Sequence, residues 1–227
     1  MAVRPLLLGH RGTRATRRIA ENTIESFDKA LEHGCDGFEF DVRLTADSSA
    51  VVCHDANVKG VKIFRASQAD LPHLARLKDV IQRYHRRVFL DIELKVKGLE
   101  ASILQVLRDH PPERDYVVSS FFREVVTELK ARSATIPTGI ICEKQRQLTG
   151  WHQLPVDYVI VQKTLVSQGL VNEIHHANRK LLVWTVNDRR SMLRLAQWGV
   201  DGIISDDTEL LVRTLRKYPT EGGSYLM

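Results

Sequence analysis

Eight short apolar runs alternate with longer amphipathic segments along the chain, and this alternation restricts the possible folds more than any other feature. The expected strands cover residues 6–9, 37–42, 88–95, 116–119, 138–141, 158–161, 181–186 and 202–205. Apolar residues at helical spacing predict helices over residues 23–33, 99–107, 123–131, 170–177, 190–198 and 209–215. Eight strand–helix units within 227 residues predict an α/β fold of the (β/α)8 TIM barrel type, with a doubly wound open sheet as the alternative.

The sequence contains no low-complexity linker and no internal repeat, so we expect residues 1–227 to form a single domain. One irregular and largely polar stretch, residues 55–72, predicts a short insertion after the second strand, over one mouth of the barrel. Asn22 directly precedes the first expected helix and is a candidate for its N-cap.

Carboxylates occupy alternate positions of two expected strands that should be apolar. Glu39 and Asp41 share one face of strand 37–42, and Asp91, Glu93 and Lys95 share one face of strand 88–95. The apolar residues of a parallel barrel strand face the surrounding helices, so the charged residues should point towards the barrel axis. A solvated edge strand with its polar residues outside is the alternative, but the same pattern recurs at the carboxyl ends of two strands, where barrel active sites lie.

Carboxylates buried in this way require a compensating cation. An isolated buried carboxylate costs several kcal/mol, and Lys95 alone cannot neutralise Glu39, Asp41 and Glu93. Oxygen ligands at this density suit the hard cations Mg²⁺ or Ca²⁺ better than zinc, which prefers nitrogen and sulfur. The pattern therefore predicts a divalent cation held by these three residues.

Two histidines lie where they can join this site. His10 follows the first strand directly, and His54 ends the short apolar run that comes after the second strand. An imidazole exchanges protons near neutral pH, which makes both residues candidates for acid–base catalysis. Arg11 is next to His10, and its planar guanidinium suits a phosphate oxygen.

With these motifs the sequence resembles the glycerophosphodiester phosphodiesterase family. The family's H-R-G…E-N-T signature is matched by residues 9–12 and 21–23, its G-x-E-x-D-V strand by residues 37–42, and its H-D by residues within 52–55. Its E-x-K motif is matched by residues 93–95, its W-T-V-N by residues 184–187, and its closing G-V-D-G-I-x-[ST]-D by residues 199–206. The matches keep the family's order over nearly the whole chain. The segment between His54 and Glu93 is shorter than the family's usual insertion, which implies a more open mouth.

The resemblance implies an activity and a set of roles. The activity is metal-dependent hydrolysis of a glycerophosphodiester to glycerol phosphate and an alcohol, by a phosphoric diester hydrolase. The implied roles are a metal site of Glu39, Asp41 and Glu93, catalytic histidines His10 and His54, phosphate contacts from Arg11 and Lys95, and a pocket for the alcohol half lined by Trp184. Asn22 would assist at this site if it is not an N-cap.

Two other functions stay open. A lysophospholipid phosphodiesterase, releasing a linear or cyclic phosphate, would need a wider apolar mouth. A catalytically inert barrel that binds phosphodiesters would be expected to lack a histidine or a metal ligand, and the sequence keeps both sets.

Charge, cysteine content and hydropathy limit which binding partners and which cellular compartment are expected. The net charge of +5 is modest and its basic residues are scattered, which argues against nucleic-acid binding. Cys35, Cys53 and Cys142 are an odd number at unrelated spacings and indicate reduced core thiols. The amino-terminal run 1–8 is too short for a secretory signal, and no apolar stretch is long enough to span a membrane. These observations predict a cytoplasmic enzyme with no integral membrane segment.

Overall fold

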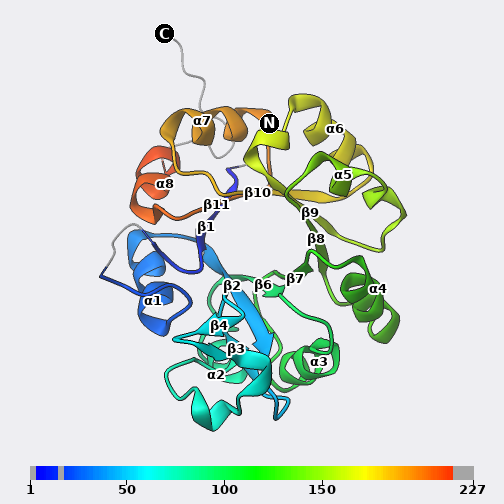
Figure 1. Ribbon diagram of the computed structural model, residues 1–227. Coiled ribbons are helices and arrows are strands. Elements are labelled where there is room, and N and C mark those ends of the chain that lie inside the picture. The colour runs from blue at the N-terminus through cyan, green and yellow to red at the C-terminus, as the bar shows by residue number, and fades with distance from the viewer. Residues whose placement is uncertain (1–3, 15–17, 217–227) are drawn as a thin grey trace.

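The computed structural model describes residues 4–14 and 18–216, and in it eight parallel strands close into a ring (Figure 1). The ring runs β1, β2, β6, β7, β8, β9, β10 and β11, and the pairing of β11 with β1 closes it. Its strands are β1 (Leu6–His10), β2 (Gly37–Leu44), β6 (Phe89–Leu94), β7 (Tyr116–Ser120), β8 (Thr138–Cys142), β9 (Tyr158–Gln162), β10 (Lys180–Trp184) and β11 (Gly202–Ser205). The predicted TIM barrel is confirmed.

Helices surround the ring on its outer side (Figure 1). They are α1 (Ile24–His33), α2 (Leu77–Tyr84), α3 (Glu100–Asp109), α4 (Arg123–Arg132), α5 (Gln145–Leu148), α6 (Gln168–His176), α7 (Arg189–Trp198) and α8 (Thr208–Leu215). Six of them lie close to the expected ranges. Helices α2 and α5 were not expected from the sequence, although Leu77, Val80, Ile81 and Tyr84 of α2 are spaced as one buried helical face.

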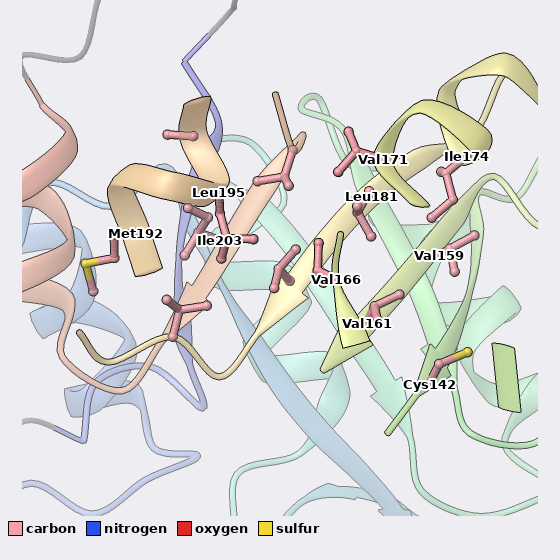
Figure 2. Close-up of a cluster of buried hydrophobic side chains, with 14 of the residues drawn as sticks. Cys142, Val159, Val161, Val166, Val171, Ile174, Leu181, Met192, Leu195 and Ile203 are labelled. Carbon is pink, nitrogen blue, oxygen red and sulfur yellow. The ribbon is translucent and has the colours of Figure 1, made fainter. Parts of the chain in front are cut away.

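Two apolar layers stabilise the barrel. The outward residues of the strands pack against the helices: in the sector shown in Figure 2, Leu181 of β10 and Ile203 of β11 belong to one cluster with Ile174 of α6 and Leu195 of α7. A second set points inward and fills the lower part of the barrel, comprising Leu8, Phe89, Val117, Ile141, Tyr158, Ile160, Leu182 and Ile204. Beyond this inner layer, charged residues such as Glu93 and Lys95 lie at the carboxyl ends of the strands, where barrel active sites are found.

The predicted insertion after β2 is present, but it has more regular structure than its composition suggested. Strand β3 (Ala50–Val52) pairs antiparallel with β2, and β4 (Asn57–Val58) and β5 (Val61–Lys62) form a small hairpin. The 3-10 turns η1 (Ile63–Arg65) and η2 (Gln68–Asp70) follow; two more, η3 (Trp151–Gln153) and η4 (Lys163–Leu165), lie in later loops. In Figure 1 the cyan hairpin lies over the β2 and α2 side of the ring.

Three further expectations concern the cysteines, membrane-spanning segments and the number of domains. Cys35, Cys53 and Cys142 are free and buried, as predicted. Among the helices in residues 4–14 and 18–216, none is both long and apolar enough to cross a membrane. Residues 1–3 of the amino-terminal run lie outside the described residues, and the single domain over 1–227 stays a prediction.

Candidate active site

A cavity of about 260 Å³ opens at the carboxyl ends of the barrel strands and is lined by both charged and apolar residues. It is lined by His10, Arg11, Glu39, His54, Asp91, Glu93, Lys95, Phe121, Ile141, Glu143, Ile160, Trp184 and Ile204. Seven of the eight residues that the sequence singled out line this cavity, and the eighth, Asp41, lies directly behind it. The structure therefore brings the candidate residues together around one cavity.

Three of the carboxylates converge as expected. One oxygen each of Glu39, Asp41 and Glu93 lies within 4.8 Å of the others, and all three side chains are buried, between 1% and 8% exposed. The strand register accounts for this geometry, because Asp41 of β2 pairs with Glu93 of β6, while Glu39 is two residues before Asp41 on the same face. Glu39 Oε1 is buried and has no hydrogen-bond partner within residues 4–14 and 18–216.

Two cations lie beside these carboxylates. Lys95 Nζ is 2.6 Å from Glu93 Oε1 and 3.2 Å from Asp41 Oδ1. Arg11 Nε is 3.2 Å from Asp41 Oδ2, and its Nη1 donates to Glu21 Oε1 at 2.8 Å. Both basic residues therefore compensate charge at the site, in addition to facing the cavity.

A fourth carboxylate increases the negative charge. Asp91 lies opposite Glu39 in the β2–β6 register, is 1% exposed, and accepts a hydrogen bond of 2.6 Å from Ser119 Oγ. The alternation of the strand places Asp91 on the inward face, but no motif in the sequence gives it a role. If all four buried carboxylates were ionised, they would carry two more negative charges than Lys95 and Arg11 compensate.

The pKa values reflect this excess. Burial, followed by the charges of Asp41, Glu93 and Asp91, raises the pKa of Glu39 well above its ordinary value. Burial and the charge of Asp41 raise the pKa of Glu93 to about 7, and burial raises that of Asp91 to about 7. Burial acts in the same direction on Asp41, but Lys95, Arg11 and Asn22 outweigh it, so the net pKa of Asp41 is lowered.

Asn22 is part of the site, and the prediction that it caps the first helix is wrong. Thr23 is the N-cap of α1, and its hydroxyl accepts from the backbone N–H of Ser26. Asn22 has a positive φ of 57°, which turns its side chain towards Asp41. Its Nδ2 donates to Asp41 Oδ2 at 2.8 Å, and its Oδ1 accepts from the backbone N–H of Asp41 at 3.1 Å. Asparagine tolerates this left-handed backbone better than most residues, which explains how it occupies the position.

Each catalytic candidate has a carboxylate partner on one ring nitrogen. His10 Nδ1 is 2.7 Å from Asp206 Oδ1, and His10 Nε2 lies 3.9 Å from Glu39 Oε2. His54 Nδ1 is 2.8 Å from Asp55 Oδ1. A carboxylate on Nδ1 fixes the ring orientation and keeps the proton there, so that Nε2 is free to exchange one. His54 is about one-third exposed, whereas His10 is almost buried.

Asp206 was missed as a functional residue. It follows β11 directly and lies 196 residues from His10 in the chain. Its Oδ2 accepts from Asn187 Nδ2 at 2.7 Å. Burial alone would raise the pKa of Asp206, but the hydrogen bond and charge of His10, with the amide of Asn187, outweigh burial and lower it to about 2. The available signal was its position at the carboxyl end of the last strand, inside the final matched motif.

The opposite wall of the cavity is apolar. Trp184 at the end of β10 meets the Phe121 ring edge-on, with centroids 5.9 Å apart. Lys95 Nζ lies 5.6 Å from the centroid of the same Phe121 ring. Trp184 Nε1 is buried and has no hydrogen-bond partner among the described residues. A ligand with an anionic centre beside the basic residues and a less polar arm beside the aromatic rings would fit this division.

The chain matches known proteins over nearly its whole length. The model of the Glycerophosphoryl diester phosphodiesterase family matches residues 10–62 and 64–210. A glycerophosphodiester phosphodiesterase of Caldanaerobacter subterraneus is 27% identical, over 95% of this chain and 99% of the relative. The glycerophosphodiester phosphodiesterase of Thermotoga maritima is 25% identical with a TM-score of 0.76, over 92% and 97% of the two chains. An Oleispira antarctica phosphodiesterase, solved with its product sn-glycerol-3-phosphate, has the same fold: TM-score 0.82 and 24% identity, over 94% and 98%.

Proposed function

The chain belongs to the glycerophosphoryl diester phosphodiesterase family, and we propose that it hydrolyses glycerophosphodiesters to glycerol phosphate and an alcohol with the help of a divalent cation. The observation that carries the proposal is the convergence of three buried carboxylates and two carboxylate-oriented imidazoles on one cavity. The family assignment supports phosphodiester cleavage, and the curated relative from Caldanaerobacter subterraneus bears that activity in its name.

Glu39, Asp41 and Glu93 would hold the cation. The donor set consists only of carboxylate oxygens, which suits Mg²⁺ or Ca²⁺. The unpartnered Glu39 Oε1 and the excess of buried negative charge both fit a divalent ion at this position. When bound, such an ion polarises a phosphoryl oxygen and lowers the pKa of a bound water.

The two histidines would move the protons. One Nε2 accepts the proton of the attacking hydroxyl, which belongs to water or to the substrate's own glycerol. In the second case a cyclic phosphate forms, and water must then open it to give glycerol phosphate. The other donates a proton to the alcohol oxygen as its bond to phosphorus breaks. Asp206 and Asp55 would keep the two imidazoles in the tautomer that this exchange needs.

Arg11 and Lys95 would bind the phosphate. Both lie next to Asp41 and line the cavity, so they can stabilise negative charge that gathers on the phosphoryl oxygens. Trp184 and the neighbouring Phe121 would contact the non-phosphate part of the substrate.

Cleavage of lysophospholipids, to a linear or cyclic phosphate, is a second candidate. The observation that favours it is the apolar wall, which includes Ile141, Ile160 and Ile204 beside the aromatic rings. An inert phosphodiester-binding barrel is less well supported, because each implied ligand and histidine is present in the site.

A metal-titrated hydrolysis assay tests the proposal. Protein treated with EDTA should not cleave glycerophosphocholine or glycerophosphoethanolamine, and Mg²⁺ or Ca²⁺ should restore turnover. Lysophosphatidylcholine in the same assay separates the two substrate classes. Glu39→Gln should weaken cation binding, while the exposed Glu128→Gln serves as the matched control. Full turnover after exhaustive chelation would contradict the metal site, and no turnover of any diester with either cation would contradict the activity.

A further inference from the structure

The large apolar side chains that remain exposed lie at one end of the barrel. Among the described residues these are Val61, Phe64 and Phe122, which are 41%, 59% and 41% exposed. Val61 and Phe64 belong to the insertion after β2, and Phe122 follows β7. All three therefore leave the carboxyl ends of the strands, where the catalytic cavity opens. Exposed apolar groups gathered on one face, rather than scattered, mark an interaction surface.

The segment that carries Val61 and Phe64 has a defined backbone conformation and its own small core. Its turn, Lys59-Gly60, has the positive φ values of 50° and 85° that two-residue hairpin turns require. Ile63 is buried in a small core with Val51, Cys53, Ala66 and Leu71. The neighbouring Phe64 is left in solvent although it is the larger apolar side chain, so its exposure does not result from a lack of packing sites nearby.

The same tip is basic. Lys59, Lys62 and Arg65 are exposed, and residues 57–65 contain no acidic residue. None of the three has a carboxylate oxygen within 4.0 Å among residues 4–14 and 18–216. Arg65 lies over the Phe64 ring, 5.4 Å from its centroid, so cationic and apolar groups form one continuous surface. We define residues 57–65 as the basic hairpin.

We propose that the basic hairpin docks the enzyme on an anionic lipid surface, with the catalytic cavity facing the lipid. Charge complementarity selects this partner: lysine and arginine near an anionic leaflet are attracted to it, while exposed phenylalanine and valine enter the headgroup region. Phe122, which follows β7 two strands round the ring from β2, supplies a second apolar contact at the same end of the barrel. The proposal does not depend on the metal or on the identity of the diester, because binding is separate from turnover.

Vesicle sedimentation with the full chain tests the docking. Binding should be strong to phosphatidylcholine vesicles that contain phosphatidylglycerol, weak to phosphatidylcholine alone, and reduced by salt. Lys59→Gln with Lys62→Gln should weaken binding about 30-fold, the product of about 5.4-fold for each cation. Val61→Ser with Phe64→Ser should remove the binding that persists in high salt, because that part comes from apolar insertion.

Two controls keep the result interpretable. Arg108→Gln with Arg114→Gln removes two cations at the opposite end of the barrel and should leave vesicle binding unchanged. The hairpin variants should keep the wild-type melting temperature and the wild-type hydrolysis of a water-soluble glycerophosphodiester, since neither pair lines the cavity. Equal binding to both kinds of vesicle, or undiminished binding by the lysine variant, would overturn the proposal. A dimer that the Val61 and Phe64 substitutions dissociate would also overturn it and identify a second copy as the partner.

Discussion

Chelation should make the stability of this protein strongly dependent on pH, and Glu93 is the residue from which the size of the effect can be worked out. Its pKa rises from 4.5 to about 7 in the folded chain, mainly through burial and then through Asp41. A carboxyl with a raised pKa binds a proton more tightly when folded, so the free energy of unfolding falls as pH rises from 4.5 to about 7. The difference between the two pKa values corresponds to roughly 3 kcal/mol at about 1.4 kcal/mol per pH unit.

A bound cation should remove most of this penalty. Mg²⁺ or Ca²⁺ favours the ionised carboxylates, so the cation should stabilise the protein more at about pH 8 than at about pH 5, and binding at neutral pH should release protons. For a chain of this size, roughly 3 kcal/mol corresponds to about 6–12 °C in melting temperature. Differential scanning calorimetry at both pH values, with EDTA or with saturating cation, measures the difference.

The matched variant is Glu93→Gln, which keeps the side-chain shape and removes the titration. In EDTA it should be more stable than the wild type at about pH 8, and its stability should depend less on pH. Equal stability of the chelated wild type at both pH values would refute the reasoning. So would a Glu93→Gln variant with the pH dependence of the wild type, because the effect would then come from other groups.

Three further predictions concern the residues around the proposed cation site. His10→Ala and His54→Ala should each lower kcat by ~10²–10⁴, and a p-nitrophenyl ester should rescue whichever variant lacks the general acid; near-wild-type kcat on glycerophosphocholine would show a misassigned histidine. Asp206→Asn should lower kcat with little change in KM, because His10 loses the carboxylate that orients it; steady-state kinetics with an unchanged kcat would contradict this role. Asn22→Ala should weaken cation binding by about 10–100-fold through the lost hydrogen bonds to Asp41, and calorimetric titration with a wild-type affinity would contradict it.

The fold and the carboxylate cluster could be predicted from the sequence because each depends on a short-range rule. Alternation along a strand decides which face a residue occupies, and it placed Glu39 and Asp41 inward before any contact was known. Phe38 and Phe40, on the opposite face, are indeed buried in the outer core. The parallel register then brings Glu93 beside Asp41 without further information.

Sequence neighbours alone gave the wrong role for Asn22, because two adjacent residues could each cap the helix. Asn22 precedes a helix and fits an N-cap, but Thr23 has a hydroxyl at the next position and takes that role. Once Thr23 caps α1, the backbone of Asn22 is free to adopt a left-handed conformation and turn its amide to Asp41. The choice depends on where the buried carboxylate needs a donor, which is a property of the tertiary structure.

The pairing of His10 with Asp206 lies beyond local rules for a different reason. The two residues are separated by 196 positions and meet only because β11 closes the barrel against β1, with Ser205 in register with Gly9. An open doubly wound sheet built from the same strands need not place the first strand next to the last. The carboxylate cluster needs only β2 beside β6, whereas the oriented histidine needs the closed ring. Barrel closure therefore supplies His10 with the carboxylate that orients its ring, which no pairing of neighbouring segments in the sequence could provide.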